Sequence, residues 1–341
     1  MNEELVSVIS PCYNGEKYLK PFLDSLLSQD YNNVEFIIIN DGSTDNSEKI
    51  ILSYQERLEK KGWTFKYIFQ ENKGQAAALN QGLKIFKGKY LMWVDSDDIL
   101  KQDNIRQKVD FLQKNSKYGM VICKTEVVNE NNLNKKIGIL KRHVKNLKKD
   151  NLFKDLITGY NVYYPPGGYM VTREAFEKSI PEKQIYESKI GQNWQMMLPI
   201  AYYYKCGYIN KILFTYVVRK GSHSRIENQD KAVLKKINEK ENTILTVVKN
   251  IDMPEEKKQK YVELVKKIYK EKKIINYYKM NDTKNIKKEF NNIIEQKQRP
   301  TVKEKIIYLS TKNKVMKFIC KIFYGVIRLG ERLYQKVSIY I

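Results

Sequence analysis

Cysteine is scarce in this sequence, and the few residues present are scattered: Cys12, Cys123, Cys206 and Cys320. No two of them form a CxxC pair, so their spacing gives neither a zinc site nor a disulfide framework. Such usage is typical of a reducing compartment, and we therefore expect a cytoplasmic protein.

Long apolar runs are also missing. A membrane-spanning helix needs about 20 consecutive apolar residues, and even the apolar C-terminal segment is interrupted by Lys317, Lys321 and Arg328. The first residues, MNEELVSVIS, are acidic and pass straight into an apolar run, whereas a signal peptide has a basic start and a longer apolar core. We expect neither a spanning helix nor a signal peptide.

Acidic residues are few in the rear of the chain. Of 62 Lys/Arg and 39 Asp/Glu, residues 1–110 hold 14 and 17, which leaves 48 and 22 for residues 111–341. A basic rear predicts an anionic partner, either anionic lipid or nucleic acid. No RNA- or DNA-binding motif accompanies it, and lysine interleaved with isoleucine is typical of packed, solvated helices, so we expect no nucleic acid.

Short apolar runs alternate with helical patterns over the first 110 residues. The pattern predicts strands over residues 6–10, 34–40, 63–69 and 90–94, and helices over 18–28, 46–60 and 74–86. This alternation is typical of βαβ units, so the fold class is α/β with a mostly parallel central sheet flanked by helices. Residues 229–300 add basic helices.

Polar clusters follow three of these strands: PCYNGE (11–16), DGSTD (41–45) and DSDD (95–98). Ligands of open α/β sheets bind at the carboxyl ends of the strands, so we expect the clusters to meet in one crevice. Carboxylates two residues apart, as in DSDD, suit Mg²⁺ or Mn²⁺ held against a diphosphate. The alternative is a helix cap at Ser96 or Asp97, but the combination of clusters favours the metal.

The other two clusters have functional and structural interpretations. Asp41 is placed to bind a nucleobase or ribose, or the segment is a turn that caps the next helix. Tyr13 is placed to stack on a base beside the Asn14-Gly15 turn, or the segment only connects strand to helix.

Together these segments resemble glycosyltransferase family 2, whose fold is GT-A (Rossmann-like). The matching segments are VSVISPCYNGEKYL, FIIINDGSTDNS, ENKGQAAALNQGL and GKYLMWVDSDDIL, in the family's order. The resemblance covers residues 5–115 specifically and 116–225 more weakly. It implies a GT-A domain over 1–225, with a donor half (1–115) and an acceptor half (116–225), followed by a basic helical region over 226–341.

The resemblance also implies site residues and a reaction. The nucleoside pocket would be lined by Pro11, Tyr13, Glu16 and Asp41, and the rest of the donor site by Gly74, Asn80, Asp95 and Ser96. Asp97 would be the metal ligand, with Asp95 beside it, for Mn²⁺ or Mg²⁺. Such enzymes usually take a UDP-sugar and invert the anomeric centre in one displacement.

An inverting transfer needs a general base, and the family supplies a Glu-Asp pair followed by an aromatic residue. The matching place here reads Gly191-Gln192-Asn193-Trp194, and neither amide can act as a base. The GQNW stretch resembles a subgroup of bacterial surface-polysaccharide glycosyltransferases. Glu187 is the substitute candidate, and its alternative is a solvated surface residue.

Two further segments carry predictions. YVVRKGSHS resembles a family element on the metal side, where Arg219 would bind diphosphate and His223 would ligate metal. The alternative for His223 is a polar surface residue, as a lone loop histidine usually is.

Residues 315–337 predict an interfacial helix for an anionic membrane, or a helix packed on the protein. Its apolar face comprises Phe318, Ile319, Ile322, Phe323, Val326, Leu329 and Leu333.

The sequence therefore predicts a glycosyltransferase that moves a sugar from a nucleotide-sugar donor to a glycan or lipid-linked acceptor in surface polysaccharide synthesis. It would be peripheral on the inner face of the plasma membrane. The alternative is a non-catalytic partner subunit of a glycosyltransferase complex, because the carboxylate pair is missing at Gln192-Asn193.

Overall fold

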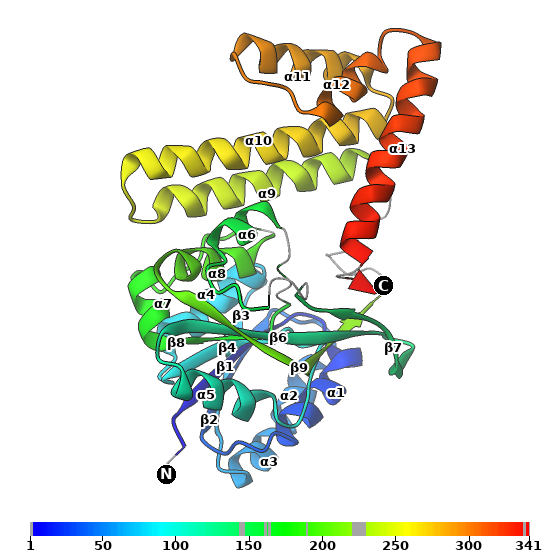
Figure 1. The fold of residues 1–341 in the computed structure, drawn as a ribbon. Helices are drawn as coiled ribbons and strands as arrows, with labels where there is room; N and C mark the ends of the chain where they lie inside the picture. The colour runs from blue at the N-terminus through cyan, green and yellow to red at the C-terminus, as the bar shows by residue number, and fades with distance from the viewer. Residues whose placement is uncertain are drawn as a thin grey trace. The chain divides into compact units, whose positions relative to one another are not determined.

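The computed structural model describes residues 3–142, 147–159, 162, 165–188, 190–219, 230–336 and 339–340. The chain divides into two compact units (Figure 1), one of residues 1–220 with 338–341 and one of residues 221–337. The first is an α/β unit around one sheet, and the second is helical.

The sheet of the first unit has the strand order β10-β7-β6-β8-β4-β1-β2-β3, and β9 pairs with β5 and β6. In its first part, residues 1–115, the elements are β1 (Val6–Cys12), α1 (Glu16–Leu27), β2 (Val34–Asp41), α2 (Ser47–Leu52), α3 (Gln55–Lys60), β3 (Thr64–Gln70), α4 (Gln75–Ile85), β4 (Tyr90–Trp93), β5 (Ile99–Leu100) and α5 (Asn104–Lys114). Its second part contains β6 (Tyr118–Asn129), β7 (Asn132–Leu140), α6 (Phe153–Thr158), β8 (Tyr169–Thr172), α7 (Arg173–Ser179), α8 (Gln192–Tyr203) and β9 (Lys205–Val218), and β10 (Ile339–Tyr340) pairs with β7.

The parallel arrangement predicted from the sequence is found in the first part, where β1, β2, β3 and β4 pair in parallel. The second part makes the sheet mixed. There β8 runs antiparallel to β4 and β6, and β7 runs antiparallel to β6. The long strand β9 is parallel to β6. The α/β fold class is confirmed, with a sheet whose two halves differ in strand direction.

Apolar strands and amphipathic helices explain the fold of residues 1–115. Strands β1 and β2 are buried along their whole length, as expected for parallel strands covered on both faces. Gly82 lets α4 lie directly on β1, because a Cβ there would come within 2.6 Å of the Ile9 side chain. The helix predicted over 46–60 is in fact two short helices, α2 and α3, separated at Ser53-Tyr54.

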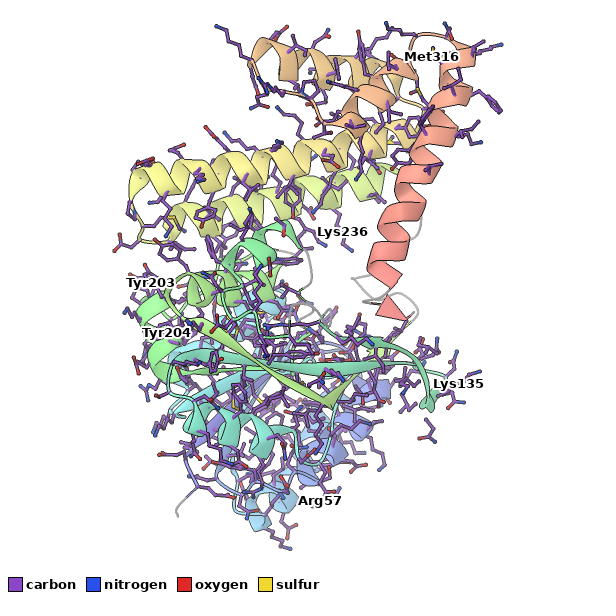
Figure 2. All side chains as sticks on the ribbon, in the orientation of Figure 1. Arg57, Lys135, Tyr203, Tyr204, Lys236 and Met316 are labelled. Carbon is purple, nitrogen blue, oxygen red and sulfur yellow. The ribbon has the colours of Figure 1, made fainter. Side chains whose placement is uncertain are left out.

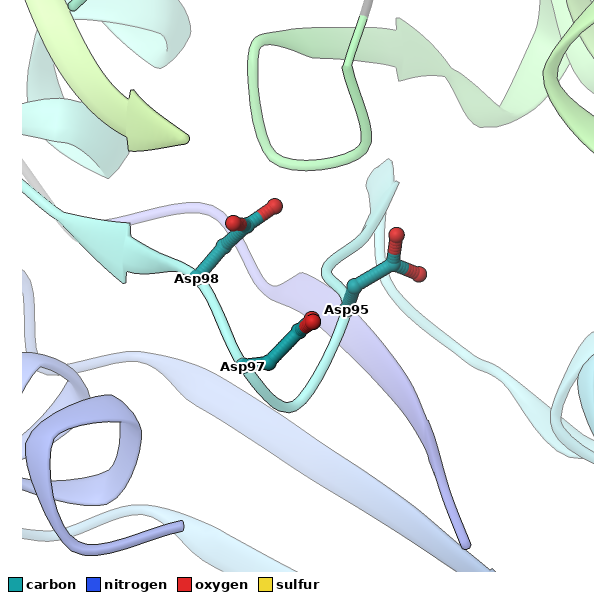
Figure 3. Close-up of side chains that lie close together, drawn as sticks. All are labelled: Asp95, Asp97 and Asp98. Atoms are coloured by element: carbon teal, nitrogen blue, oxygen red, sulfur yellow. The ribbon is translucent and has the colours of Figure 1, made fainter. Parts of the chain in front are cut away.

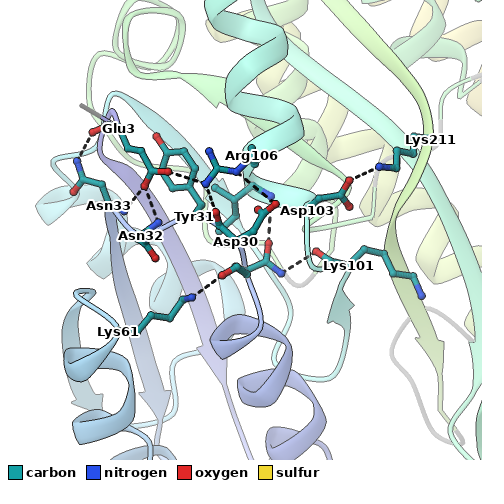
Figure 4. Close-up of polar contacts among 12 residues, drawn as sticks. Glu3, Asp30, Tyr31, Asn32, Asn33, Lys61, Lys101, Asp103, Arg106 and Lys211 are labelled. Carbon is teal, nitrogen blue, oxygen red and sulfur yellow. Dashed lines mark hydrogen bonds and ion pairs between the residues drawn. The ribbon is translucent and has the colours of Figure 1, made fainter. Parts of the chain in front are cut away.

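A polar network ties the amino ends of β1 and β2 to α5 (Figure 4). Arg106 of α5 contacts the carboxylates of Glu3 and Asp30, and Glu3 also accepts a hydrogen bond from the Asn32 backbone at 2.8 Å. These contacts fix the end of the sheet that lies opposite the carboxyl ends of the strands. The polar clusters predicted from the sequence follow the carboxyl ends.

A buried lysine supports the turn that precedes β8. Lys108 of α5 is fully buried, and its ammonium donates hydrogen bonds to the Gly167 carbonyl and, at 2.8 Å, to Asn104. Burial lowers the pKa of Lys108 to about 8. Gly167 has φ +83°, and any Cβ there would collide with Phe214.

The second unit consists of α9 (Asp230–Asn250), α10 (Glu255–Lys279), α11 (Thr283–Glu295), α12 (Val302–Leu309) and α13 (Lys314–Lys336). A small core of Ile274, Ile286, Ile293 and Ile307 joins α10, α11 and α12. Thr301 and Glu304 form a capping box that starts α12. Within the described residues, every helix is too short or too polar to cross a bilayer.

Candidate functional site

Hydrogen bonds join the loops that follow β1 and β2. Asn14, at φ +47°, donates from its backbone to Ser43 at 2.9 Å and accepts from the Thr44 backbone at 2.8 Å. Glu16 accepts from the Asn46 side chain at 2.8 Å, and Asp45 accepts from the Glu16 backbone at 3.1 Å. PCYNGE and DGSTD therefore form one surface.

Asp41 holds a third loop against this surface. Its buried carboxylate accepts hydrogen bonds from Gln70 at 2.6 Å and from the backbone N–H groups of Lys73 and Gly74, both at 2.9 Å. Gly74, with φ +89°, begins α4 at this point. Asp41 thus fixes the loop before α4. This structural role is separate from the contact with a nucleoside that the sequence predicts for Asp41.

Three carboxylates gather where β4 ends (Figure 3). Asp95, Asp97 and Asp98 each offer an oxygen, and these oxygens all lie within 4.8 Å of one another. Asp95 accepts a hydrogen bond from Gln75 at 2.7 Å, and Asp98 accepts one from the Val217 backbone at 2.8 Å. The cluster is therefore tied to α4 on one side and to β9 on the other.

Burial and mutual repulsion disfavour the charged form of these carboxylates when no cation is bound. Burial first, and then the charge of Asp97, raise the pKa of Asp95 from 3.8 to about 7. Burial also raises the pKa of Asp97, against the opposing effect of Arg219, and raises the pKa of Asp98 well above its usual range. Within the described part of the chain, the second oxygen of Asp98 is buried without a hydrogen-bond partner. An oxygen-rich donor set of this kind suits a divalent cation.

Arg219 lies beside the cluster. Its guanidinium forms an ion pair with Asp97 and lies over the Tyr18 ring, 4.8 Å from the centroid. The Tyr18 hydroxyl donates to Glu130 at 2.8 Å, so the ring under Arg219 is itself held by the β6–β7 turn. His223, the other residue predicted for this side, lies outside the described residues.

Asn193 occupies the predicted base position as a structural acceptor. Its side-chain oxygen accepts the Trp93 indole N–H at 3.0 Å and the Tyr169 O–H at 2.8 Å. The two rings pack edge to face with centroids 5.9 Å apart. Asn193 therefore ties the first turn of α8 to β4 and β8.

Two amide side chains fix the loop that carries Glu187. Asn80 of α4 donates to the Ile185 carbonyl at 2.9 Å and accepts from the Ile185 N–H at 2.8 Å. Gln195 of α8 does the same for Tyr186, at 2.8 Å and 2.6 Å. Glu187 itself is exposed, so its carboxylate points from a fixed loop into solvent-accessible space.

The remaining predicted residues surround this arrangement. Pro11 is buried on β1 opposite Ile39, Tyr13 is 52% exposed, and Ser96 stands within the DSDD turn. Tyr13 is thus accessible for stacking.

Sequence reasoning did not select Asp98 or Gln195. Asp98 could have been found in the sequence, because it directly follows Asp97. Gln195 could not, because its role depends on its contact with Tyr186, which only the structure shows.

The chain is similar in sequence to known glycosyltransferases. The chain is 40% identical over 124 residues to an uncharacterized glycosyltransferase of Rickettsia prowazekii, covering 36% of this chain and 37% of that protein. It is 29% identical over 265 residues to glycosyltransferase GlyA of Streptococcus pneumoniae, covering 75% of this chain and 36% of GlyA. The chain thus spans about a third of the length of these curated relatives.

Solved structures share the fold at low sequence identity. S. aureus TarS 1–349 in complex with UDP-GlcNAc matches with a TM-score of 0.56 and 17% identity, over 90% of this chain and 79% of that one. A mannosyltransferase from Pyrobaculum calidifontis in complex with GDP-Man and Mn²⁺ matches with a TM-score of 0.53 and 17% identity, over 78% and 69%.

A family model described as glycosyl transferase family 2 matches residues 7–180, which is more than half of the chain. This match covers the joined loops, the Asp41-held turn and the aspartate cluster. The chain belongs to glycosyl transferase family 2.

Proposed function

We propose that this chain transfers a sugar from a nucleotide-sugar donor, a UDP-sugar, to a glycan or lipid-linked acceptor in surface polysaccharide synthesis. The observation that carries the proposal is the aspartate cluster at the end of β4, beside Arg219 and the loops after β1 and β2. The UDP-GlcNAc and GDP-Man complexes of the structural neighbours support a nucleotide-sugar donor.

In this proposal residues 1–115 hold the donor. Tyr13 stacks on the base, Pro11 and Glu16 line the nucleoside pocket, and the loop held by Asp41 closes it around Gly74. Asn80 acts from α4 through the loop at Ile185 rather than by touching the donor. Residues 116–225 hold the acceptor, and residues 226–341 attach the protein to the inner face of the plasma membrane.

Mn²⁺ or Mg²⁺ fits the aspartate cluster, because three carboxylates converge there and one buried oxygen has no protein partner among the described residues. Asp97 is the proposed ligand, with Asp95 and Asp98 beside it. When bound, the cation neutralises charge on the departing nucleoside diphosphate. Arg219 supplies a fixed positive charge on the same side, since Asp97 and Tyr18 orient it.

Glu187 is the proposed general base for an inverting displacement. The base must reach the acceptor hydroxyl as it attacks, and Asn193 is unable to take a proton. Glu187 is exposed in a loop whose backbone is fixed at both preceding residues by Asn80 and Gln195. A fixed backbone with an accessible carboxylate is what this role requires.

Thermal unfolding with UDP, GDP, CDP and ADP, each with and without Mn²⁺, tests the donor site. A ligand that binds only the native state raises the midpoint, so we expect a rise with UDP that depends on Mn²⁺. Asp97→Ala should abolish that rise and all metal-dependent transfer.

Full activity of Asp97→Ala would refute the metal assignment. Nucleotide binding without transfer by the purified chain would instead favour a non-catalytic partner subunit.

A further inference from the structure

Over residues 314–326, whose side chains the structure describes, helix α13 packs on its unit through the face that carries Cys320 and Tyr324. Cys320 is buried, and the Tyr324 ring lies 5.2 Å from that of Tyr278 on α10. The large apolar side chains on the other side remain between 39% and 68% exposed: Val315, Phe318, Ile319, Ile322, Phe323 and Val326. We call these six residues the α13 apolar face.

Helical geometry separates this face from the packed one. At 100° per residue, the six side chains span an arc of about 140°. Cys320 and Tyr324 lie outside that arc. The exposed lysines Lys314, Lys317 and Lys321 lie on a third face between the two. Figure 2 shows side chains projecting from this helix near Met316. Among the described residues, packing within the unit covers the face of Cys320 and Tyr324 and leaves the α13 apolar face exposed.

The charge around this face favours an anionic surface as its partner. Residues 230–336 carry 28 Lys/Arg and 13 Asp/Glu, and α13 alone carries six basic residues and one acidic residue. A second copy of the chain would bring lysine rows of the same sign together. An anionic bilayer instead accepts the apolar face at the boundary of headgroups and acyl chains, while the lysines reach lipid phosphates.

We propose that α13 docks the protein on an anionic lipid surface through the α13 apolar face and its flanking lysines. This inference extends the proposed function, which places a lipid-linked acceptor at the membrane. It assigns the contact to six named side chains out of a region of more than one hundred residues.

Co-sedimentation of the full chain with vesicles tests it. We expect binding to vesicles of phosphatidylglycerol and phosphatidylcholine, weaker binding to phosphatidylcholine alone, and loss at high salt. Phe318→Ser with Phe323→Ser should lower partitioning about tenfold or more. Lys317→Gln or Lys321→Gln should each lower binding to the anionic vesicles about fivefold.

The matched control is Ile294→Ser with Val302→Ser, which changes two apolar side chains of the same unit that are 52% and 68% exposed. This control should bind within twofold of the wild type. Equal loss in both double variants, or full binding by the Phe318/Phe323 variant, would overturn the proposal.

Two further measurements separate this proposal from folding defects and from donor binding. All four changed side chains are exposed, so both variants should unfold at the wild-type midpoint. The UDP-induced rise in midpoint should also be unchanged, so a failed membrane contact is distinguishable from a failed donor site. A wild-type chain that ignores vesicles and forms a dimer dependent on Phe318 and Phe323 would replace the bilayer with a second copy.

Discussion

Asp98→Asn tests whether the aspartate cluster is built for a cation. Asp98 is buried, and one of its oxygens accepts the Val217 N–H at 2.8 Å. Asparagine keeps that acceptor and places an NH₂ group where the other oxygen lacks a partner among the described residues. The change therefore removes one negative charge with little change in shape, and it adds donors that face Asp95 and Asp97.

The expected magnitude follows from the spacing of the carboxylates. Two full charges 4.8 Å apart repel by about 3.5 kcal/mol at an effective dielectric constant of 20. Protonation already relieves most of this, because burial and the neighbouring aspartates raise the pKa of Asp98 well above its usual range. We expect Asp98→Asn to stabilise the cation-free protein by about 1 kcal/mol, or about 2–4 °C in midpoint.

The assay is thermal unfolding in EDTA and again in Mn²⁺ with UDP. Asp98→Asn should raise the midpoint in EDTA and lose at least half of the rise that Mn²⁺ and UDP give the wild type. A lower midpoint in EDTA, or an undiminished response to Mn²⁺, would refute the reasoning.

Asp98→Ala is the matched control for the Val217 hydrogen bond. It removes the same charge but leaves the buried Val217 N–H without an acceptor, which costs about 1–3 kcal/mol. The alanine variant should therefore have a lower midpoint than the asparagine variant in both conditions. Equal midpoints would show that the backbone contact contributes nothing.

Three other changes have defined outcomes. Glu187→Gln should lower kcat about 100-fold or more with UDP affinity unchanged, and retained kcat would exclude Glu187 as the base. Asn193→Ala should lower the free energy of unfolding by about 2 kcal/mol, because the buried Trp93 and Tyr169 donors lose their acceptor; chemical denaturation measures this, and an unchanged value would contradict it. Burial lowers the pKa of Lys108 to about 8, so above that pH the unfolded chain binds more protons than the folded chain. The free energy of unfolding should therefore rise between about pH 8 and pH 10, and Lys108→Met should lack this rise. A wild-type free energy of unfolding that stays flat or falls relative to that of Lys108→Met would contradict the assignment.

Local pattern was sufficient to predict most elements of residues 1–94. The apolar run predicted as a strand over 34–40 is β2, Val34–Asp41, and the pattern over 74–86 is α4, Gln75–Ile85. Strand β2 was predictable because it is buried along its whole length and is therefore a continuous apolar run. The split of 46–60 into α2 and α3 was not readable, because the break at Ser53-Tyr54 carries no glycine or proline.

Long-range pairing limited the prediction of the fold over residues 116–219. Strand β6 pairs with β9, almost 90 residues later, with register shifts on the way. No periodicity in either segment specifies that partner. The same limit applies to the site, since Asn80 contacts Ile185 and Asp98 contacts Val217. Residue types in the sequence predicted the polar clusters, but only the structure shows which residues form hydrogen bonds with each other.

Asn193 is a neutral amide that holds β4 and β8 to α8. It accepts hydrogen bonds from Trp93 of β4 and Tyr169 of β8, and burial, followed by the Asp95 charge, raises the pKa of Tyr169. A carboxylate at position 193 would add a negative charge next to the Tyr169 hydroxyl. The amide keeps the hydrogen bonds and avoids that charge. In the proposed mechanism the general base lies elsewhere, and the loop held by the other two amides, Asn80 and Gln195, carries the exposed carboxylate of Glu187.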